Sequence, residues 1–466
     1  MLISTAHHAD VIIVGAGTAG LSAAHQLIAA GLSVTVLEAA ARPGGRMATE
    51  EIDGFRLDRA GQLLNTSYPE LHRTAGLGEV VLRPFAPGVL VHSGGRLQRT
   101  GETVHRASEP GSAGRGSLRA VRGGAAQGAR GAAWGPPHAL RGIGGAFTVA
   151  RALAGAPRPL DEARLGASLA RLAGTSVARL MTRPELPTAR SLAARGLPTR
   201  TVQGFLRPLL SALLCDPELT TSSRCADLAL RGFARGRMCV PEGGAATLPE
   251  RLAAALPPGT VLTGVRVKDA SINRVSTEEY GELTCRALML ATGAREAAEL
   301  LPGLRVPAFH PVTVLHHTAP SAPPTGSALV LDAEREGPVS HTAVMSEVDP
   351  TRAPRGRVLI SSTVLGTPPP YLDRQVRTHL AKLYGTPTAD WSLLAVHHNP
   401  EAVPAMPPPH DVRRPVRLLA GLYVCGDHRD TSTVQGALHS GRRAAEAVLR
   451  DMGVRPAERA PLREAA

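Results

Sequence analysis

The chain has few lysines, few aromatic residues and few cysteines, and each shortage excludes a kind of site. Of its 52 basic residues only Lys268 and Lys382 are lysines, and the other 50 are scattered arginines that form no basic run interleaved with aromatics. We therefore expect no nucleic-acid partner, although a formal charge of +13 allows peripheral contact with an anionic membrane surface. Five cysteines without C-x-x-C spacing argue against a disulfide framework and against a Cys-ligated zinc site.

Long apolar runs are also missing. No run is long enough to cross a membrane, and residues 1–9 are too short for a signal peptide. We therefore expect a soluble, cytoplasmic protein. With 466 residues and an ordinary apolar fraction of 43%, the chain can bury a large core, and two domains are expected.

Residues 10–47 are the most informative part of the sequence. The apolar run at 11–14 predicts a buried strand. Gly15, Gly17 and Gly20 follow as G-x-G-x-x-G. In this motif the first glycine permits a tight turn, the second lets the backbone approach a pyrophosphate, and the third lets the next helix pack closely on the strand.

An acidic residue completes this unit. Residues 33–37 predict a second strand, and Glu38 follows about 20 residues beyond the glycines, where a carboxylate accepts hydrogen bonds from a ribose 2′-hydroxyl. A 2′-phosphate would be repelled there, so we expect a nucleotide other than NADP. The free N–H groups at the start of the intervening helix suit a diphosphate. The sequence therefore predicts an α/β dinucleotide-binding unit.

A second Gly-rich turn follows Glu38. Gly44 and Gly45 are flanked by Arg42 and Arg46, at a point where a nicotinamide dehydrogenase would enter a crossover helix. This turn indicates a second backbone approach to the same diphosphate, with an arginine supplying positive charge. The pattern favours FAD over NAD.

Three segments resemble the flavin-containing amine oxidase superfamily, which includes protoporphyrinogen oxidases and phytoene desaturases. They are GAGTAGLSAA at 15–24, LEAAARPGGRM at 37–47 and GLYVCGDHRDTSTVQGALHSGRRAAEAVL at 421–449. Within that superfamily the chain is most similar to phytoene-desaturase-like oxidoreductases. The resemblance implies an α/β fold, with a Rossmann-like FAD-binding domain, an inserted α+β substrate domain and non-covalent FAD.

The resemblance also implies where FAD is bound. It places the backbone near Val267 at the adenine, Asp427 at the ribityl or diphosphate region, and the start of the last helix at flavin N1 and C2=O. A helix N-terminus there would stabilise the negative charge of a reduced flavin. The residues expected to contact FAD are Gly15, Ala16, Gly17, Ala19, Gly20, Glu38, Ala39, Arg42, Gly44, Gly45, Arg46, Gly61, Gln62, Val267, Thr292, Gly293, Gly426, Asp427, Gln435, Gly436 and Ala437.

The expected domains are discontinuous. Residues 1–100, 235–300 and 410–455 form the expected FAD-binding domain, 146–234 and 301–409 the substrate domain, and 456–466 a tail. Residues 106–145 are rich in Gly, Ala, Arg and Ser, and we expect a disordered low-complexity insertion there; the alternative is a stretch read in a shifted frame. Helices are expected at 147–172, 185–196, 199–214 and 371–383, a single strand at 260–268, and short antiparallel strands from 312 to 400.

Catalytic residues are harder to assign, because flavin oxidation of a C–H bond needs orientation more than side-chain chemistry. His428 is the one candidate for proton transfer, and its alternative is a structural or solvent-facing role. The adjacent histidines at 7–8, 316–317 and 397–398 would point to opposite faces of a strand, so no metal site is expected.

Two departures weaken the amine-oxidase interpretation. True amine oxidases of this fold carry a lysine near flavin N5, and neither Lys268 nor Lys382 is well placed for that role. Their aromatic cage is also missing, with Thr433 where an aromatic would precede the last helix. We therefore expect dehydrogenation or desaturation of a small, apolar substrate by hydride transfer to flavin N5, with an electron acceptor that the sequence does not identify. The alternatives are a flavin amine oxidase and an FAD-binding protein without turnover.

Overall fold

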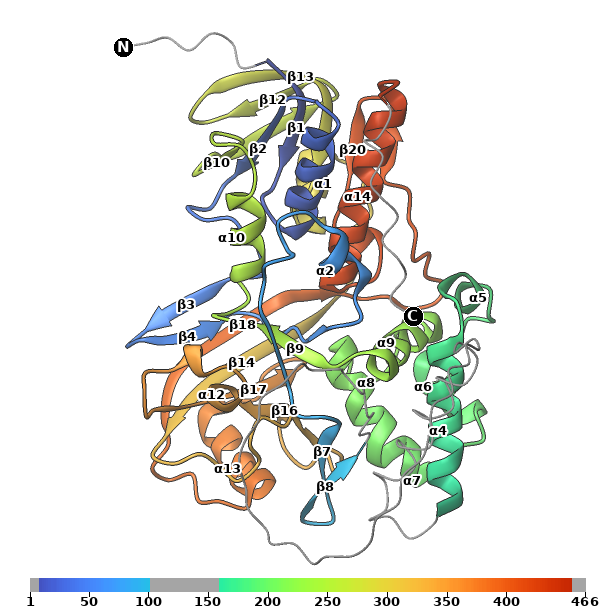
Figure 1. Cartoon of the computed structure of the whole chain (residues 1–466), viewed down its shortest axis with the longest axis vertical. Helices are drawn as coiled ribbons and strands as arrows, with labels where there is room; N and C mark the ends of the chain where they lie inside the picture. The colour runs from blue at the N-terminus through green and yellow to red at the C-terminus, as the bar shows by residue number, and fades with distance from the viewer. Residues whose placement is uncertain (1–7, 101–158, 455–466) are drawn as a thin grey trace, which may run out of the picture.

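The computed structural model describes residues 8–100 and 159–454 of the chain, arranged around two large sheets (Figure 1). The first sheet has a parallel centre, because β10, β2, β1, β13 and β20 pair in parallel, and antiparallel pairs extend it at β12–β11 and β19. Its strands are β10 (Val261–Thr263), β2 (Val34–Glu38), β1 (His8–Val14), β13 (Gly281–Leu290), β12 (Arg274–Thr277), β11 (Val267–Ser271), β20 (Leu422–Val424) and β19 (Arg417–Leu419).

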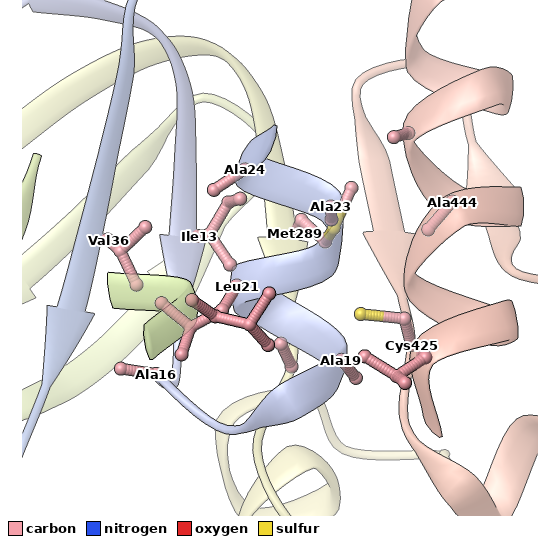
Figure 2. Close-up of a cluster of buried hydrophobic side chains, with 14 of the residues drawn as sticks. Ile13, Ala16, Ala19, Leu21, Ala23, Ala24, Val36, Met289, Cys425 and Ala444 are labelled. Atoms are coloured by element: carbon pink, nitrogen blue, oxygen red, sulfur yellow. The ribbon is translucent and has the colours of Figure 1, made fainter. Parts of the chain in front are cut away.

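Helices α1 (Thr18–Ala29) and α14 (Val434–Asp451) pack side by side on this sheet (Figure 1). Small residues allow the close approach, since a Cβ at Gly441 would lie only 2.1 Å from the carbonyl oxygen of Ala19. Figure 2 shows Ile13 of β1, Ala23 of α1 and Ala444 of α14 in the buried cluster between them. Helix α10 (Thr247–Ala254) also contacts α1, and α11 (Ala294–Leu300) follows β13.

The second sheet has seven strands, all antiparallel to their neighbours except for the β15–β7 pair. Its order is β18 (Ser392–Pro404), β14 (Phe309–Ala319), β17 (Val358–Leu365), β16 (Val339–Val344), β15 (Val330–Asp332), β7 (Val89–Ser93) and β8 (Arg96–Thr100). Helix α13 (Leu372–Tyr384) buries Val376 and Leu380 against one face. A group of consecutive helices contributes to a separate core with Val89, Val91 and Leu331.

These helices follow one another along the chain, and the π-helical segment η1 (Val202–Leu206) connects α7 directly to α8. They are α4 (Pro159–Gly174), α5 (Val177–Met181), α6 (Thr188–Ala194), α7 (Thr199–Thr201), α8 (Arg207–Leu214) and α9 (Ser223–Arg235). Two small sheets lie between the large ones: β3 (Thr49–Ile52) with β4 (Phe55–Asp58), and β5 (Leu64–Asn65) with β9 (Met238–Pro241) and β6 (Leu82–Pro84). Helix α2 (Pro69–Arg73) contacts α14, and helix α12 (Met345–Val348) contacts β17.

The predicted α/β fold class is confirmed, as are the first strand–helix–strand unit and the helices at 185–196, 199–214 and 371–383. The single strand predicted at 260–268 is wrong. Gly264, at a φ of +73°, turns the chain out of β10 so that β11 pairs antiparallel with β12 instead. The antiparallel sheet predicted at 312–400 is confirmed, with short strands at β15 and β16. Strands β14 and β18 are longer than predicted, with 11 and 13 residues.

Strands β7 and β8 belong to the second sheet, although residues 1–100 were assigned to the FAD-binding domain. The cause is the parallel pairing of β7 with β15, which draws this early segment away from the first sheet. The low-complexity stretch at 106–145, the first part of the helix expected at 147–172, and the tail at 456–466 lie outside the described residues. In the described ranges no helix is long and apolar enough to cross a membrane.

Candidate functional site

The Gly-rich turn between β1 and α1 has no room for side chains at two of its glycines. Gly15 has a φ of +106°, and a Cβ there would lie 2.9 Å from the carbonyl oxygen of Ala291. A Cβ at Gly20 would lie 2.2 Å from the carbonyl oxygen of Gly15. Gly17 differs, because its φ is an ordinary −75° and a Cβ there would meet nothing within 4 Å. Since Gly17 lines a cavity, its missing side chain leaves space for a ligand.

This cavity, the main cavity, has a volume of about 780 Å³, within the range of cofactor sites. Its walls are the β1–α1 turn, the end of β2, residues 44–47, residues 265–268, residues 291–294 and the start of α14. These segments are far apart in the sequence, and they meet because β1 lies between β2 and β13 at the centre of the first sheet. Ligands of open α/β sheets bind at the carboxyl ends of the strands, which is where this cavity lies.

Backbone and carboxylate groups prepare one part of the main cavity for a nucleotide. Helix α1 begins after Gly17 without a side-chain cap, so its positive end is open to an anion. Glu38 accepts the N–H of Ala16 on Oε2 at 2.8 Å and the N–H of Ala40 on Oε1 at 2.9 Å. These bonds fix the carboxylate at the cavity wall, and each oxygen keeps a lone pair for a ligand hydroxyl.

One ion pair ties the loop after β2 to the loop after β20. Arg46 Nη2 lies 2.6 Å from Asp427 Oδ1, and Arg46 Nη1 donates to the carbonyl oxygen of Ala402 at 2.9 Å. Both charged residues line the main cavity. Arg42, the other arginine predicted to supply charge, is exposed and lies outside the cavity lining.

The start of α14 forms another part of the wall. Thr433 caps the helix by accepting the N–H of Gly436 on Oγ1 at 3.1 Å, and Thr433 and Ala437 both line the main cavity. Gln435 has another partner, since its Oε1 accepts the N–H of Glu70 at 3.0 Å. The helix therefore presents its N-terminus and small side chains to the cavity.

Most residues predicted to contact FAD line the main cavity: Gly15, Gly17, Ala19, Glu38, Ala39, Gly44, Gly45, Arg46, Gln62, Val267, Thr292, Gly293, Gly426, Asp427 and Ala437. The others, Ala16, Gly20, Arg42, Gly61, Gln435 and Gly436, do not. Sequence reasoning missed the wall from the second sheet, formed by Phe309, Asn399, Pro400, Glu401 and Pro404. No local motif marks these residues, because they reach the cavity only through the long-range pairing of β14 with β18.

A smaller cavity of about 50 Å³, the minor cavity, adjoins the main cavity at Gln62, which lines both. A Cβ at Gly61 would lie 2.8 Å from Thr363 Oγ1, so this glycine lets the loop lie close to β17. The apolar lining is Ala60, Leu63, Phe85, Val240, Val314, Leu329, Ala343 and Met345; the polar lining is Asp58, Gln62, His316, His341, Thr342, Arg352, Ser361 and Thr363. The minor cavity therefore offers a ligand both apolar and polar contacts.

Two neutral histidines belong to this lining. His316 Nε2 donates to the carbonyl oxygen of Asp58 at 3.0 Å, which leaves Nδ1 to accept from the Ser361 hydroxyl at 2.8 Å. Burial lowers the pKa of His316 to about 4, and burial lowers the pKa of His341 to the same value. Both imidazoles are therefore uncharged at neutral pH.

Lys268 lines the main cavity, but neither of the two lysines nor His428 lines the minor cavity. Lys268 Nζ pairs with Glu278 at 2.9 Å and Lys382 Nζ with Glu336 at 3.7 Å, and neither lysine lines the minor cavity. Burial lowers the pKa of His428 to about 4, and within the described ranges its ring nitrogens have no hydrogen-bond partner. His428 lines neither cavity, so its imidazole does not reach a ligand bound in either one.

The histidine pair at 316–317 alternates across β14 as expected for a strand. His316 bonds Ser361 of the neighbouring strand, whereas His317 Nε2 lies 2.9 Å from Asp373 Oδ1 of α13 on the other face. In the part of the chain that the structure describes, no group of three or more His, Cys, Asp or Glu could hold a metal ion.

The parallel sheet, the Gly-rich turn and the acidic residue after β2 define a dinucleotide-binding α/β protein. A family model described as flavin containing amine oxidoreductase matches residues 18–449. The chain belongs to this family of FAD-dependent enzymes, and its membership implies an FAD cofactor.

Curated relatives match only in short segments. Putrescine oxidase from Kocuria rosea is 49% identical over 67 residues, which is 14% of each chain. The L-amino acid oxidase Bs29 from Bothriechis schlegelii is 47% identical over 75 residues, which is 16% of this chain and 14% of the relative. Each match spans less than a fifth of either chain.

Solved structures match over nearly the whole chain. Putrescine oxidase bound to putrescine has a TM-score of 0.63 at 18% identity, covering 95% of this chain and 99% of that one. An oxidoreductase from Methanosarcina mazei has a TM-score of 0.65 at 13% identity, covering 94% and 100%. Reduced UDP-galactopyranose mutase has a TM-score of 0.63 at 14% identity, covering 95% and 96%. At these identities the likeness shows the shared fold.

Proposed function

We propose that the main cavity holds FAD without a covalent bond and that the enzyme uses it to dehydrogenate or desaturate a small substrate. The observation that carries this proposal is the convergence of the open α1 N-terminus, Glu38, Arg46 and the start of α14 on one cavity. The α1 N-terminus would hold the diphosphate and Glu38 the ribose hydroxyls. Residues 265–268 would face the adenine, and Asp427 the ribityl chain.

Bound FAD supplies a hydride acceptor at N5, and the protein supplies position and electrostatics. The minor cavity is the proposed substrate site, because it adjoins the main cavity at Gln62, which lines both. The apolar side chains of Phe85, Val240 and Leu329 would exclude water from the reacting carbon. His316 is already held by two hydrogen bonds and would serve as a fixed, neutral wall.

The cysteines support non-covalent attachment. All five are buried, and none lines the main cavity. Cys425 comes closest in sequence to the predicted FAD contacts, but burial raises the pKa of its thiol to about 12. A protonated, buried thiol is a poor nucleophile, so it gives no route to a flavin–cysteine bond.

We also propose the two-domain division of the chain, with one change. Sheet membership and the buried clusters support residues 8–88, 235–300 and 410–454 as the FAD-binding domain and residues 89–100, 159–234 and 301–409 as the substrate domain. Strands β7 and β8 then belong to the substrate domain, because their partner β15 lies in its sheet.

Amine oxidation is the second candidate, favoured by the putrescine oxidase likeness. Against it stands the absence of both lysines from the minor cavity. A third possibility is bound FAD without turnover, which would show as flavin that no candidate substrate reduces.

The test is an absorbance spectrum of the purified protein before and after denaturation. A flavin band that is released on unfolding supports non-covalent FAD, and a colourless protein that takes up no added FAD would overturn the proposal. Anaerobic mixing with substrate candidates follows. Bleaching by an amine would favour the second candidate, and bleaching by a C–H donor without an amine the first.

A further inference from the structure

The minor cavity contains a cation whose hydrogen-bonding capacity is only partly used. Arg352 ends the 3-10 helix η2 (Pro350–Arg352), which follows α12, and it is 1% exposed. Its Nε donates to the carbonyl oxygen of Arg56 at 2.9 Å, and its Nη2 lies 2.9 Å from Asp58 Oδ2. Nη1 is buried and has no hydrogen-bond partner within the described residues. A buried guanidinium donor without an acceptor is costly, so an acceptor is expected to complete it.

A second unpartnered group lines the same cavity. His341 of β16 is 3% exposed and pairs in register with Thr363 of β17. Its Nδ1 is buried and has no hydrogen-bond partner in the ranges described. Because the ring is neutral, Nδ1 carries the proton in one of its two tautomers. In that tautomer Nδ1 can donate to the same acceptor as the Arg352 guanidinium.

The charges around the cavity select the kind of acceptor. Asp58 is the one carboxylate in the lining, and it is already committed. Its Oδ2 pairs with Arg352, and its Oδ1 accepts the Thr49 hydroxyl at 2.7 Å and the N–H of Ala245 at 2.8 Å. A ligand ammonium group would therefore find a guanidinium and no free carboxylate. A ligand carboxylate would find two unused donors.

We propose that the minor cavity binds the carboxylate of the substrate, with Arg352 and His341 as its partners. This inference rests on the proposed function, because it takes the minor cavity as the substrate site beside Gln62. A volume of about 50 Å³ suits a carboxylate on a short carbon chain, with the reacting carbon toward the main cavity. The substrate class is then a small carboxylic acid with an apolar body, and not a polyamine or a hydrocarbon polyene.

The probes are propionate and propylamine, which share a three-carbon chain and differ in the charge of the head group. Dissociation constants are measured by ligand-observed NMR on the full-length protein as purified, so the readout does not depend on turnover. We expect propionate to bind at least tenfold more tightly than propylamine. Propionate should also shift the visible spectrum of the bound flavin, because the minor cavity adjoins the main one.

Two variants test the partners. Arg352→Lys keeps a cation beside Asp58 but replaces the guanidinium with a single ammonium group, so the donor at Nη1 is lost. It should weaken propionate binding at least tenfold. His341→Leu removes the imidazole and should weaken propionate binding several-fold. Thr318→Val is the matched control, since Thr318 Oγ1 is also buried without a partner but lies outside the cavity lining. It should leave propionate binding unchanged.

The outcomes separate this inference from the proposed function. Propionate that fails to bind to a protein with reducible FAD overturns the inference and leaves the proposed function standing. Arg352-dependent propionate binding to a protein without FAD supports the inference and contradicts the proposed function. If Arg352→Lys does not fold, unchanged propionate binding in His341→Leu overturns the inference, and a several-fold loss supports it.

Discussion

Arg46 Nη2 lies 2.6 Å from Asp427 Oδ1, although the two residues are 381 positions apart in the sequence. The Asp427 side chain is 4% exposed, so removing the arginine leaves a nearly buried carboxylate without a cation. We expect Arg46→Ala to lower the free energy of unfolding by about 1–3 kcal/mol, as for an unsatisfied buried group. Urea denaturation of the apoprotein measures this change.

The same substitution should weaken FAD binding, because Arg46 lines the main cavity and is the arginine expected to supply positive charge to the diphosphate. Arg46→Lys is the control, since it keeps a charge beside Asp427 and should retain more of both properties. Fluorescence titration with FAD gives the affinities. Wild-type stability together with wild-type FAD affinity in Arg46→Ala would contradict the role assigned to this pair.

The glycines of the first turn give a prediction that separates folding from ligand binding. A Cβ at Gly20 would lie 2.2 Å from a backbone oxygen, so Gly20→Ala should destabilise the protein severely. Gly17→Ala meets no protein atom within 4 Å and should change the free energy of unfolding by less than about 1 kcal/mol. Its methyl group would instead occupy the space proposed for the diphosphate. We expect at least tenfold weaker FAD binding, measured by titration, with Gly78→Ala as a neutral control.

Three buried histidines make stability depend on pH. Burial lowers the pKa of His316, His341 and His428 from 6.5 to about 4 in the folded protein. Between these values the unfolded chain binds protons that the folded chain does not, so stability falls as the pH is lowered from 6.5 toward 4. Each histidine contributes about 1.4 kcal/mol per pH unit to that slope.

His428→Leu tests this directly, because the His428 ring has no hydrogen-bond partner to lose in the described structure. The variant should show a slope of unfolding free energy against pH that is shallower by about 1.4 kcal/mol per unit over this window. Urea denaturation at several pH values provides the slopes. Parallel curves for the variant and the wild type would show that His428 does not titrate in this way.

The two lysines should be dispensable for flavin reduction. Both form exposed ion pairs, which contribute about 0–1 kcal/mol to stability. We expect Lys268→Ala and Lys382→Ala to keep the wild-type rate of anaerobic flavin reduction within about twofold, measured by stopped-flow absorbance. A large loss of rate in either variant would favour a lysine-dependent amine oxidation.

The local part of the fold was predictable from the sequence, and the long-range part was not. The β1–α1–β2 unit is encoded in consecutive residues, so its glycines and Glu38 could be placed in advance. The route of β7 into the second sheet depends on pairing with β15, some 240 positions later, and no local pattern carries that information. The strand break at Gly264 was missed because a lone glycine in an apolar run has more than one explanation.

The site was predictable to a similar extent. Motif residues such as Gly17 and Asp427 line the main cavity, whereas Asn399 and Glu401 reach it only through the second sheet. The minor cavity could not be foreseen, because Arg352 and His341 come from a short 3-10 helix and a strand that carry no motif. Gln435 lay in a recognised motif, but its side chain is engaged by the backbone of Glu70.

The close packing of α1 against α14 has a consequence for how the protein is made. The Ser22 hydroxyl donates to the carbonyl oxygen of Leu438 at 3.1 Å. The last part of the chain to line the main cavity comprises Gly426, Asp427, Thr433, Val434 and Ala437. On the ribosome the N-terminal strands and α1 emerge first, with the surface that α14 will cover still open to solvent. Loading of the cofactor into a complete site must therefore wait until residues 426–437 have emerged, and a chain truncated before residue 426 would lack this part of the lining.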